Sequence, residues 1–151
     1  MDVLTVHMAR TGVKTLANIA FANAFATAMD RSARMRGIEP LMTLRYNPAV
    51  PCKLPQVLRL MTAKPDAVFI AASGGPAVTP VRELRQRGYT GTIYSNPGAA
   101  SSDVLRLGGT ALEGFVLATS PFFVGEQLPA QSPVKPVALE FDHAYETRFA
   151  H

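Results

Sequence analysis

The sequence predicts an α/β fold, a three-layer αβα sandwich built on a five-stranded parallel sheet. Strand-like and helix-like stretches alternate along its 151 residues, which are enough for one domain with a sizeable core. One stretch, Ala67 to Ala72, is apolar at every position, as is typical of a strand buried on both faces. Alternation implies crossover connections between parallel strands, with helices on both faces. We expect the flavodoxin-like strand order 2-1-3-4-5.

The first half of the chain shows both helical and strand periodicity. We expect a helix over 2–11, a strand over 13–21, a helix over 23–36, a strand over 39–46 and a helix from residue 54. The first of these helices ends at Gly12 and the second at Gly37. Residues 39–46 alternate between apolar and polar, which indicates an edge strand with one wet face.

Two helices of this half carry an apolar side by their spacing. The helix over 23–36 is expected to place Phe25, Ala28, Met29 and Ser32 on one side. In the helix from residue 54, the positions i, i+3, i+4 and i+7 are Leu54, Val57, Leu58 and Met61. We expect these rows to define the faces of the two helices.

The second half continues the alternation. We expect strands over 67–72, 91–95 and 114–118, helices over 76–87 and 101–107, and an irregular segment with three prolines before a last helix. That helix has a long apolar stripe, formed by Val134, Val137, Ala138, Phe141, Ala144, Tyr145 and Phe149. We interpret residues 1–151 as one α/β domain.

Charge and cysteine content exclude several classes of protein. The net charge is +4, but the arginines gather near the ends of predicted helices, where cations suit the helix dipole. We therefore predict no nucleic-acid partner. A single cysteine, Cys52, forms no disulfide within the chain. We predict no membrane span, and the start of the chain lacks the pattern of a signal peptide, which implies a cytoplasmic protein if Met1 is the true start.

The predicted site lies at the carboxyl ends of the strands, where open α/β sheets bind ligands. The residues expected there are Phe25, Ser73, Gly74, Gly75, Asn96 and Gly98. Ser73-Gly74-Gly75-Pro76 is a ligand contact for an uncharged group or a carboxylate, or else a plain turn. It lacks the lysine of a phosphate loop, and Pro76 removes one N–H donor. Phe25 either contacts an apolar ligand or staples its own helix.

Nothing in the sequence predicts catalysis, a metal site or a cofactor. The histidines His7, His143 and His151 fall on predicted helices or the tail. Asp66 and Glu113 precede their strands, at the edge opposite the predicted site. A paired acid/base system or a metal cluster would need such groups at the strand ends. We therefore predict a protein that is not an enzyme, with a small enzyme on the same scaffold as a minor alternative.

The segment Lys64 to Ala118 resembles the periplasmic substrate-binding proteins of branched-chain amino acid ABC transporters. "HMARTGVKTLANIAF" and "PVKPVALEFDHAYETRF" fit the same family on either side. These proteins clamp a ligand between two α/β lobes, and this chain is similar to the second lobe alone. The resemblance implies a periplasmic location, an ABC permease as partner, and an amino acid or related carboxylate as ligand.

The chain departs from the family pattern at three places. Phe25 stands in a segment where relatives often have Tyr-Gly-Glu-Gly, and Asn96-Pro97-Gly98 stands where many have a glutamate for the ligand's ammonium. The loop over 47–52 lacks the usual polar residues. Together with an absent first lobe, this predicts weak binding by the isolated lobe. The alternative is a homodimer or other partner-binding remnant without a transport role.

Overall fold

The computed structural model describes residues 1–20, 23–45 and 54–149. The chain divides into two compact units, Met1–Ala118 and Thr119–His151. The first unit holds the sheet and most of the buried side chains, and the second holds a 3-10 segment and a long helix. One domain over residues 1–151 stays a prediction.

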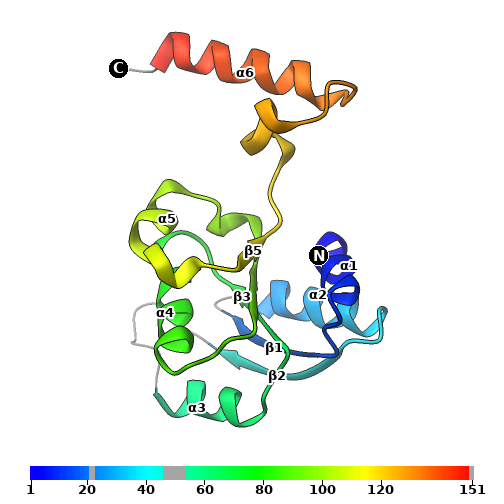
Figure 1. The fold of residues 1–151 in the computed structure, drawn as a ribbon, viewed down its shortest axis with the longest axis vertical. Coiled ribbons are helices and arrows are strands. Elements are labelled where there is room, and N and C mark those ends of the chain that lie inside the picture. Colours follow the sequence, from blue (N-terminus) through cyan, green and yellow to red (C-terminus); the bar gives the residue numbers. More distant parts are fainter. Residues whose placement is uncertain (21–22, 46–53, 150–151) are drawn as a thin grey trace. The chain divides into compact units, whose positions relative to one another are not determined.

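The sheet of the first unit has the predicted order and direction. Its strands are β1 (Thr15–Ala20), β2 (Glu39–Arg45), β3 (Ala67–Ala71), β4 (Thr92–Ser95) and β5 (Phe115–Leu117). They lie in the order β2-β1-β3-β4-β5, and every neighbouring pair is parallel (Figure 1). The flavodoxin-like prediction is confirmed, and β2 is an edge strand as its alternation indicated.

Helices cover both faces of this sheet, which makes the three predicted layers (Figure 1). The helices of the first unit are α1 (Asp2–Arg10), α2 (Asn23–Arg34), α3 (Leu54–Thr62), α4 (Val78–Gln86) and α5 (Ser102–Gly108). On one face, Leu16, Phe69 and Tyr94 are buried against α1 and α2. On the other, Ile19 and Ile70 are buried in a cluster with apolar residues of α3 and α4.

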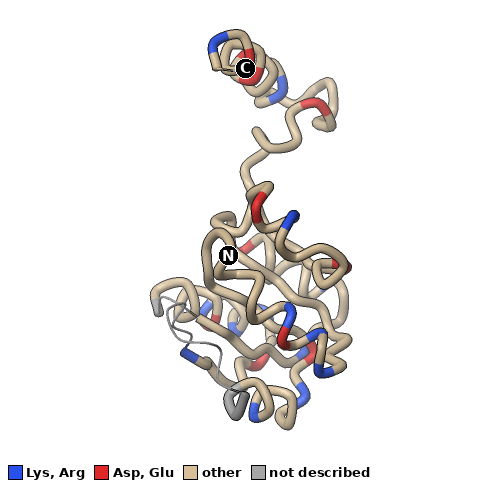
Figure 2. Tube along the Cα trace, turned by 90° about the vertical axis from the view of Figure 1, so that its left-hand side faces the viewer, with Lys and Arg blue, Asp and Glu red and all other residues tan. Residues whose placement is uncertain are grey.

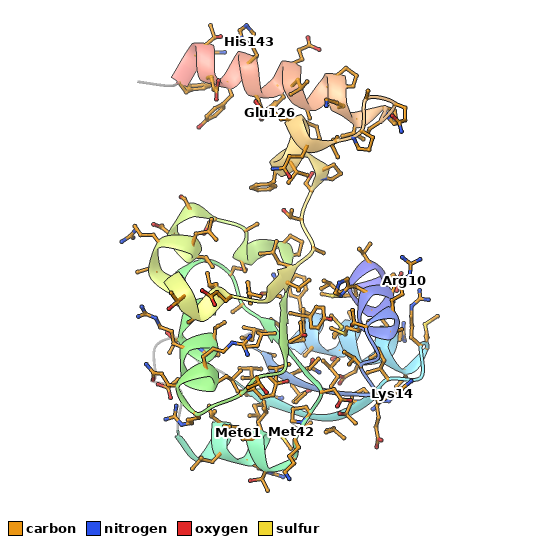
Figure 3. All side chains as sticks on the ribbon, viewed as in Figure 1. Arg10, Lys14, Met42, Met61, Glu126 and His143 are labelled. Carbon is orange, nitrogen blue, oxygen red and sulfur yellow. The ribbon has the colours of Figure 1, made fainter. Side chains whose placement is uncertain are left out.

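The cluster on the face covered by α3 and α4 extends to the edge strand β2. Val57 and Leu60 of α3 are fully buried in it, while Leu58 is 48% exposed. Met42 of β2 and Met61 of α3 pack against the cluster from the same side (Figure 3). The predicted apolar row on this helix was therefore correct at Val57 and Met61 and wrong at Leu58, because the buried side of α3 is centred on Leu60.

The buried side of α2 also differs from the expected one. Met29 and Ser32 are buried as predicted, but Ala28 is exposed and Phe25 is 44% exposed. Ala26 and Ala33 complete the buried row at i, i+3 and i+7. Small residues face the sheet here because α2 lies close to β1 and β2, so size alone was a poor guide to the buried face.

Polar contacts tie the first helix to the rest of the unit. Ser32 of α2 donates a hydrogen bond of 2.7 Å from its hydroxyl to a carboxylate oxygen of Asp2, and its Oγ lies 2.9 Å from Oγ1 of Thr5. Nδ1 of His7 lies 3.1 Å from the hydroxyl of buried Tyr94 in β4. The N-terminal helix is thereby anchored to both α2 and the sheet.

Asp66 fastens the amino edge of the sheet. Its Oδ2 accepts hydrogen bonds from the backbone N–H groups of Lys14 and Thr15, at 2.9 and 2.8 Å. Its own N–H donates to Oγ1 of Thr15 at 2.9 Å. The bond from the Lys14 N–H is the largest cause that lowers the pKa of the Asp66 carboxyl below its ordinary value. The placement of Asp66 opposite the predicted site is confirmed.

The second unit consists of η4 (Pro121–Gln127) and α6 (Val134–Phe149). Ala138 is the fully buried side chain of α6, and its Cβ would stand 3.1 Å from a Cβ added to Gly125. Nζ of Lys135 donates to the carbonyls of Glu126 and Leu128, at 2.9 and 2.7 Å. Within this unit, η4 and α6 are joined by the close approach of Gly125 to Ala138, by the edge-on rings of Phe122 and Phe141, whose centroids lie 5.9 Å apart, and by the hydrogen bonds of Lys135.

The predicted apolar stripe of the last helix lies mostly exposed within this unit. Val137, Phe141, Tyr145 and Phe149 are each more than half exposed and follow one another at intervals of four residues. The three aromatic rings of this row contact one another in succession. The ring centroids of Phe141 and Tyr145 are 6.3 Å apart, and those of Tyr145 and Phe149 are 5.0 Å apart. None of the helices in the described part of the chain is long and apolar enough to cross a membrane.

Candidate functional site

The candidate site is formed by the turns that follow β3 and β4. Ser73 and Gly74 lead from β3 into η1 (Gly75–Ala77), and Asn96 leads from β4 into η2 (Pro97–Ala99). Because β3 and β4 are parallel neighbours, both turns come to the same edge of the sheet. Five of the six predicted site residues belong to these turns.

A backbone hydrogen bond joins the two turns. The N–H of Gly74 donates to the carbonyl of Gly98 at 2.8 Å. A Cβ added to Gly98 would stand 2.9 Å from Cβ of Ser73 and 3.0 Å from Nδ2 of Asn96, which leaves no room for a side chain. The structure therefore brings Ser73, Gly74, Asn96 and Gly98 into one contact.

Glycine is also required at the first turn. Gly74 has φ of +60° and ψ of −155°, a conformation that essentially glycine alone adopts. Its neighbour Gly75 approaches α5, since an added Cβ would stand 3.2 Å from Cδ1 of Leu107. Local sequence patterns do not reveal this approach of Leu107 to the turn, because Gly75 and Leu107 lie far apart along the chain.

The turn after β3 offers fewer free donors than a phosphate cradle needs. The N–H of Gly74 is bonded to Gly98, the N–H of Ala77 donates to the carbonyl of Gly74 at 2.9 Å, and Pro76 has no N–H. The backbone N–H groups of Gly74 and Ala77 are therefore not free to donate to a ligand. The arrangement favours a neutral or singly charged ligand group over a phosphate.

Asn96 supplies an unused acceptor. Its side chain is 3% exposed, and its Oδ1 has no hydrogen-bond partner among the described residues. A buried amide oxygen without a donor costs about 1–3 kcal/mol. The neighbouring Ser95 is satisfied, since its hydroxyl donates to the carbonyl of Ile70 at 2.8 Å. A donor group of a ligand would complete the hydrogen bonding of Asn96.

Phe25 lies in the first turn of α2, beyond the carboxyl end of β1. Its ring is 44% exposed, and the buried row of the helix is made by other residues. This argues for a surface available to a ligand and against a staple of the helix. Cys52 and His151 lie outside the described residues, while His7 and His143 are exposed on α1 and α6.

Sequence reasoning missed a buried polar group on the same sheet. Asn18 of β1 is fully buried, and its Nδ2 donates to Oδ1 of Asp30 at 2.5 Å and to Oγ1 of Thr43 at 3.3 Å. It was hidden in an apolar run, "TLANIA", where strand periodicity alone gives no reason to single it out. Within the described residues, no three side chains of His, Cys, Asp or Glu come together as a metal site.

Comparisons with known proteins show the family of this chain. A model of the periplasmic binding protein family matches residues 5–149. The chain belongs to this family. An extracellular ligand-binding receptor from Rhodopseudomonas palustris HaA2 is similar, with 32% identity and a TM-score of 0.89 over 97% of this chain and 42% of the receptor. A protein from R. palustris CGA009 is 32% identical, with a TM-score of 0.90 and the same coverages.

More distant periplasmic binding proteins share the fold. A leucine binding protein from Thermotoga maritima has 20% identity and a TM-score of 0.82, over 99% of this chain and 42% of that protein. The chain thus spans about 42% of the length of these solved relatives. None of the curated proteins compared matches it. The predicted resemblance to periplasmic binding proteins is confirmed.

Proposed function

We propose that this chain is the second ligand-binding lobe of a solute receptor for an amino-acid type ABC importer. The chain takes a small amino-acid-like or carboxylate ligand at the carboxyl ends of β3 and β4. The observation that carries this proposal is the contact between the two turns, where Gly74 bonds to Gly98 beside the unpartnered oxygen of Asn96. The family match over residues 5–149 supports it.

The chemistry of the two turns narrows the ligand. No Asp or Glu occurs in residues 72–77 or 95–100, so a ligand ammonium facing these turns would lose water without gaining a carboxylate. Burying an unpaired charge costs several kcal/mol. A ligand hydroxyl or amide suits these turns because it can donate to Oδ1 of Asn96, whereas a ligand carboxylate, which only accepts, faces another part of the lobe, and any ammonium is held elsewhere.

One lobe contacts only one side of a clamped ligand. Affinity in a clamp comes from enclosing the ligand on both sides, so we expect this chain alone to bind with a Kd of about 1 mM or weaker, or about −4 kcal/mol. Isothermal titration calorimetry with leucine, valine and aromatic acids tests this. A micromolar Kd for the monomer would contradict the proposal of a half site.

The same proposal covers location and partner. As part of a solute receptor the protein works in the periplasm, delivers its ligand to an ABC permease, and carries out no catalysis. Membership of the periplasmic binding protein family supports these statements. Fractionation of cells that produce the protein from its own gene tests the location, and recovery from the cytoplasm alone would contradict it.

A second candidate function is partner binding without transport. It rests on the exposed apolar row of α6, formed by Val137 and the aromatic residues Phe141, Tyr145 and Phe149. Exposed apolar patches of this kind often mark association surfaces. Two copies of the chain that meet through such a surface would form the expected homodimer. Sedimentation velocity at several concentrations tests it, and a strict monomer at every concentration argues against it.

A further inference from the structure

A hollow of about 900 Å³ lies at the edge of the sheet opposite the candidate ligand site. It is open to solvent and is lined by the end of α4, the turn that leads into β4, and the segment from η3 (Gly109–Leu112) to the start of β5. Its polar lining consists mainly of Arg82, Arg85, Thr90, Thr92, Thr110 and Glu113. A volume of this size is in the range of ligand pockets.

Arg85 is held in a fixed position beside this hollow. Its Nη1 donates to the carbonyls of Tyr89 and Gly91 at 2.7 and 2.9 Å, and its Nη2 donates to the carbonyl of Glu113 at 3.3 Å. A guanidinium has five N–H donors, so two remain for another partner. Arg85 is half-buried, and a Cβ added to Gly114 would stand 3.9 Å from Nη2, an ordinary contact distance, so Gly114 borders the guanidinium.

The positive charge of the hollow is only partly neutralised. Arg87, which follows the end of α4, forms an ion pair with Glu83, so these two charges neutralise each other. In the described parts of the chain, no carboxylate forms an ion pair with Arg82 or Arg85. Glu113 is the acid among the lining residues. Elsewhere on the first unit, basic and acidic positions are interspersed (Figure 2).

We propose that this hollow binds an oxyanion, such as the phosphate, sulfate or carboxylate group of a small molecule. The preset guanidinium of Arg85 donates its two remaining N–H groups, and Arg82, three residues earlier on α4, adds a second positive charge. The threonine hydroxyls at positions 90, 92 and 110 supply neutral donors. The site is independent of the proposed function, because it lies at the other end of β4.

The test is an NMR titration of the whole chain with inorganic phosphate at neutral pH and constant ionic strength. We expect saturable shifts of the amides of Thr90, Gly91, Thr110 and Glu113 in the millimolar range. Parallel titrations with sulfate and acetate show which oxyanion binds best. A separate titration with sodium chloride is the control for charge screening, because chloride changes the ionic strength without supplying an oxyanion.

Three variants make the result specific. Arg82→Gln removes an exposed charge and should weaken binding by about two- to fivefold, and Glu113→Gln should strengthen it by a similar factor. Arg106→Gln is the matched control, because Arg106 is exposed on α5, pairs with Asp103 and does not line the hollow. Unfolding curves verify that each variant folds. Shifts that do not saturate, or equal effects of Arg82→Gln and Arg106→Gln, would overturn the proposal.

Discussion

The two units of this protein use apolar residues in opposite ways. In the first unit, the parallel sheet buries side chains on both faces, and Phe69 and Tyr94 are completely inaccessible. In the second unit, the 16-residue helix α6 buries Ala138 and leaves Phe141, Tyr145 and Phe149 more than half exposed. The second unit has five aromatic residues in 33 and the first has seven in 118, yet it is the first unit that buries aromatic rings in a core.

The difference teaches what an amphipathic pattern does and does not specify. A strand has neighbours on both sides and layers above and below, so its apolar residues find partners within the same fold. Within the second unit, α6 packs against one 3-10 segment, so this unit by itself leaves most of the apolar stripe of α6 uncovered. The pattern shows which face requires a partner, and the surroundings decide whether that partner is present.

The largest effect is expected from removing an aromatic ring in the first unit. Phe69→Ala creates a cavity in a fully buried position and should lower the free energy of unfolding by about 3–5 kcal/mol. The matched change in the second unit, Phe141→Ala, should cost less than about 1 kcal/mol, because that ring is 58% exposed. Urea denaturation of both variants measures the contrast. Equal losses of unfolding free energy in the two variants would show that the ring of Phe141 is packed as completely as the ring of Phe69.

The next effect concerns the contact between the two turns at the candidate site. Gly98→Ala forces a methyl group against Ser73 and should cost about 1–3 kcal/mol. Adding Ser73→Gly makes room, so the double variant should recover part of that loss in a double-mutant cycle. Ser102→Ala, at an exposed position nearby, is the control. Zero coupling between positions 73 and 98 would contradict the close approach.

A smaller effect is expected at the opposite edge of the sheet. Asp66→Ala removes the acceptor for two backbone N–H groups and should cost about 1 kcal/mol at neutral pH. The folded-state pKa of Asp66 is lowered, so its contribution to stability is present above the unfolded value of about 3.9 and is lost as the pH falls through the folded pKa.

Urea denaturation at several values between pH 6 and pH 2.5 checks this dependence on pH. The difference in unfolding free energy between the wild type and Asp66→Ala should shrink as the solution becomes more acidic. Other carboxyl groups titrate in both proteins, and the subtraction removes their contribution. A difference that stays constant over this range would contradict the role given to the Asp66 charge.

The smallest effect is expected from ending the chain after Ala118. Every hydrogen bond described for η4 and α6 lies within the second unit, so the first unit should keep its unfolding free energy within about 1 kcal/mol. Circular dichroism and urea denaturation of residues 1–118 measure this. A loss of several kcal/mol would mean that the apolar row of α6 is part of the core, which would remove the contrast between the units.

The sequence predicted the sheet better than it predicted the helix faces. The apolar run at Ala67–Ala71 and the alternation at Glu39–Arg45 each reflect a single geometric rule, and both strands lie where they were expected. The faces of α2 and α3 depend on how closely each helix approaches the sheet. Short side chains at Ala26 and Ala33 permit that approach, and a count of large apolar residues overlooks them.

The candidate site was predictable in place but not in detail. Parallel topology assigns Ser73, Gly74, Asn96 and Gly98 to one edge, and the structure brings these four together. The hydrogen bond that consumes the Gly74 donor, and the burial of Asn96, arise between turns more than twenty residues apart in the sequence. Local sequence contains no information on such a contact, because it depends on strand register.

The hydrogen bond from the N–H of Gly74 to the carbonyl of Gly98 also makes the opening of the site measurable by hydrogen–deuterium exchange. A backbone proton held in such a bond is replaced by deuterium only when the two turns separate. Its replacement rate therefore counts how often this edge opens, without any label or substitution. A solute that bridges the turns would slow that exchange, whereas one that binds at the far end of β4 would leave it unchanged.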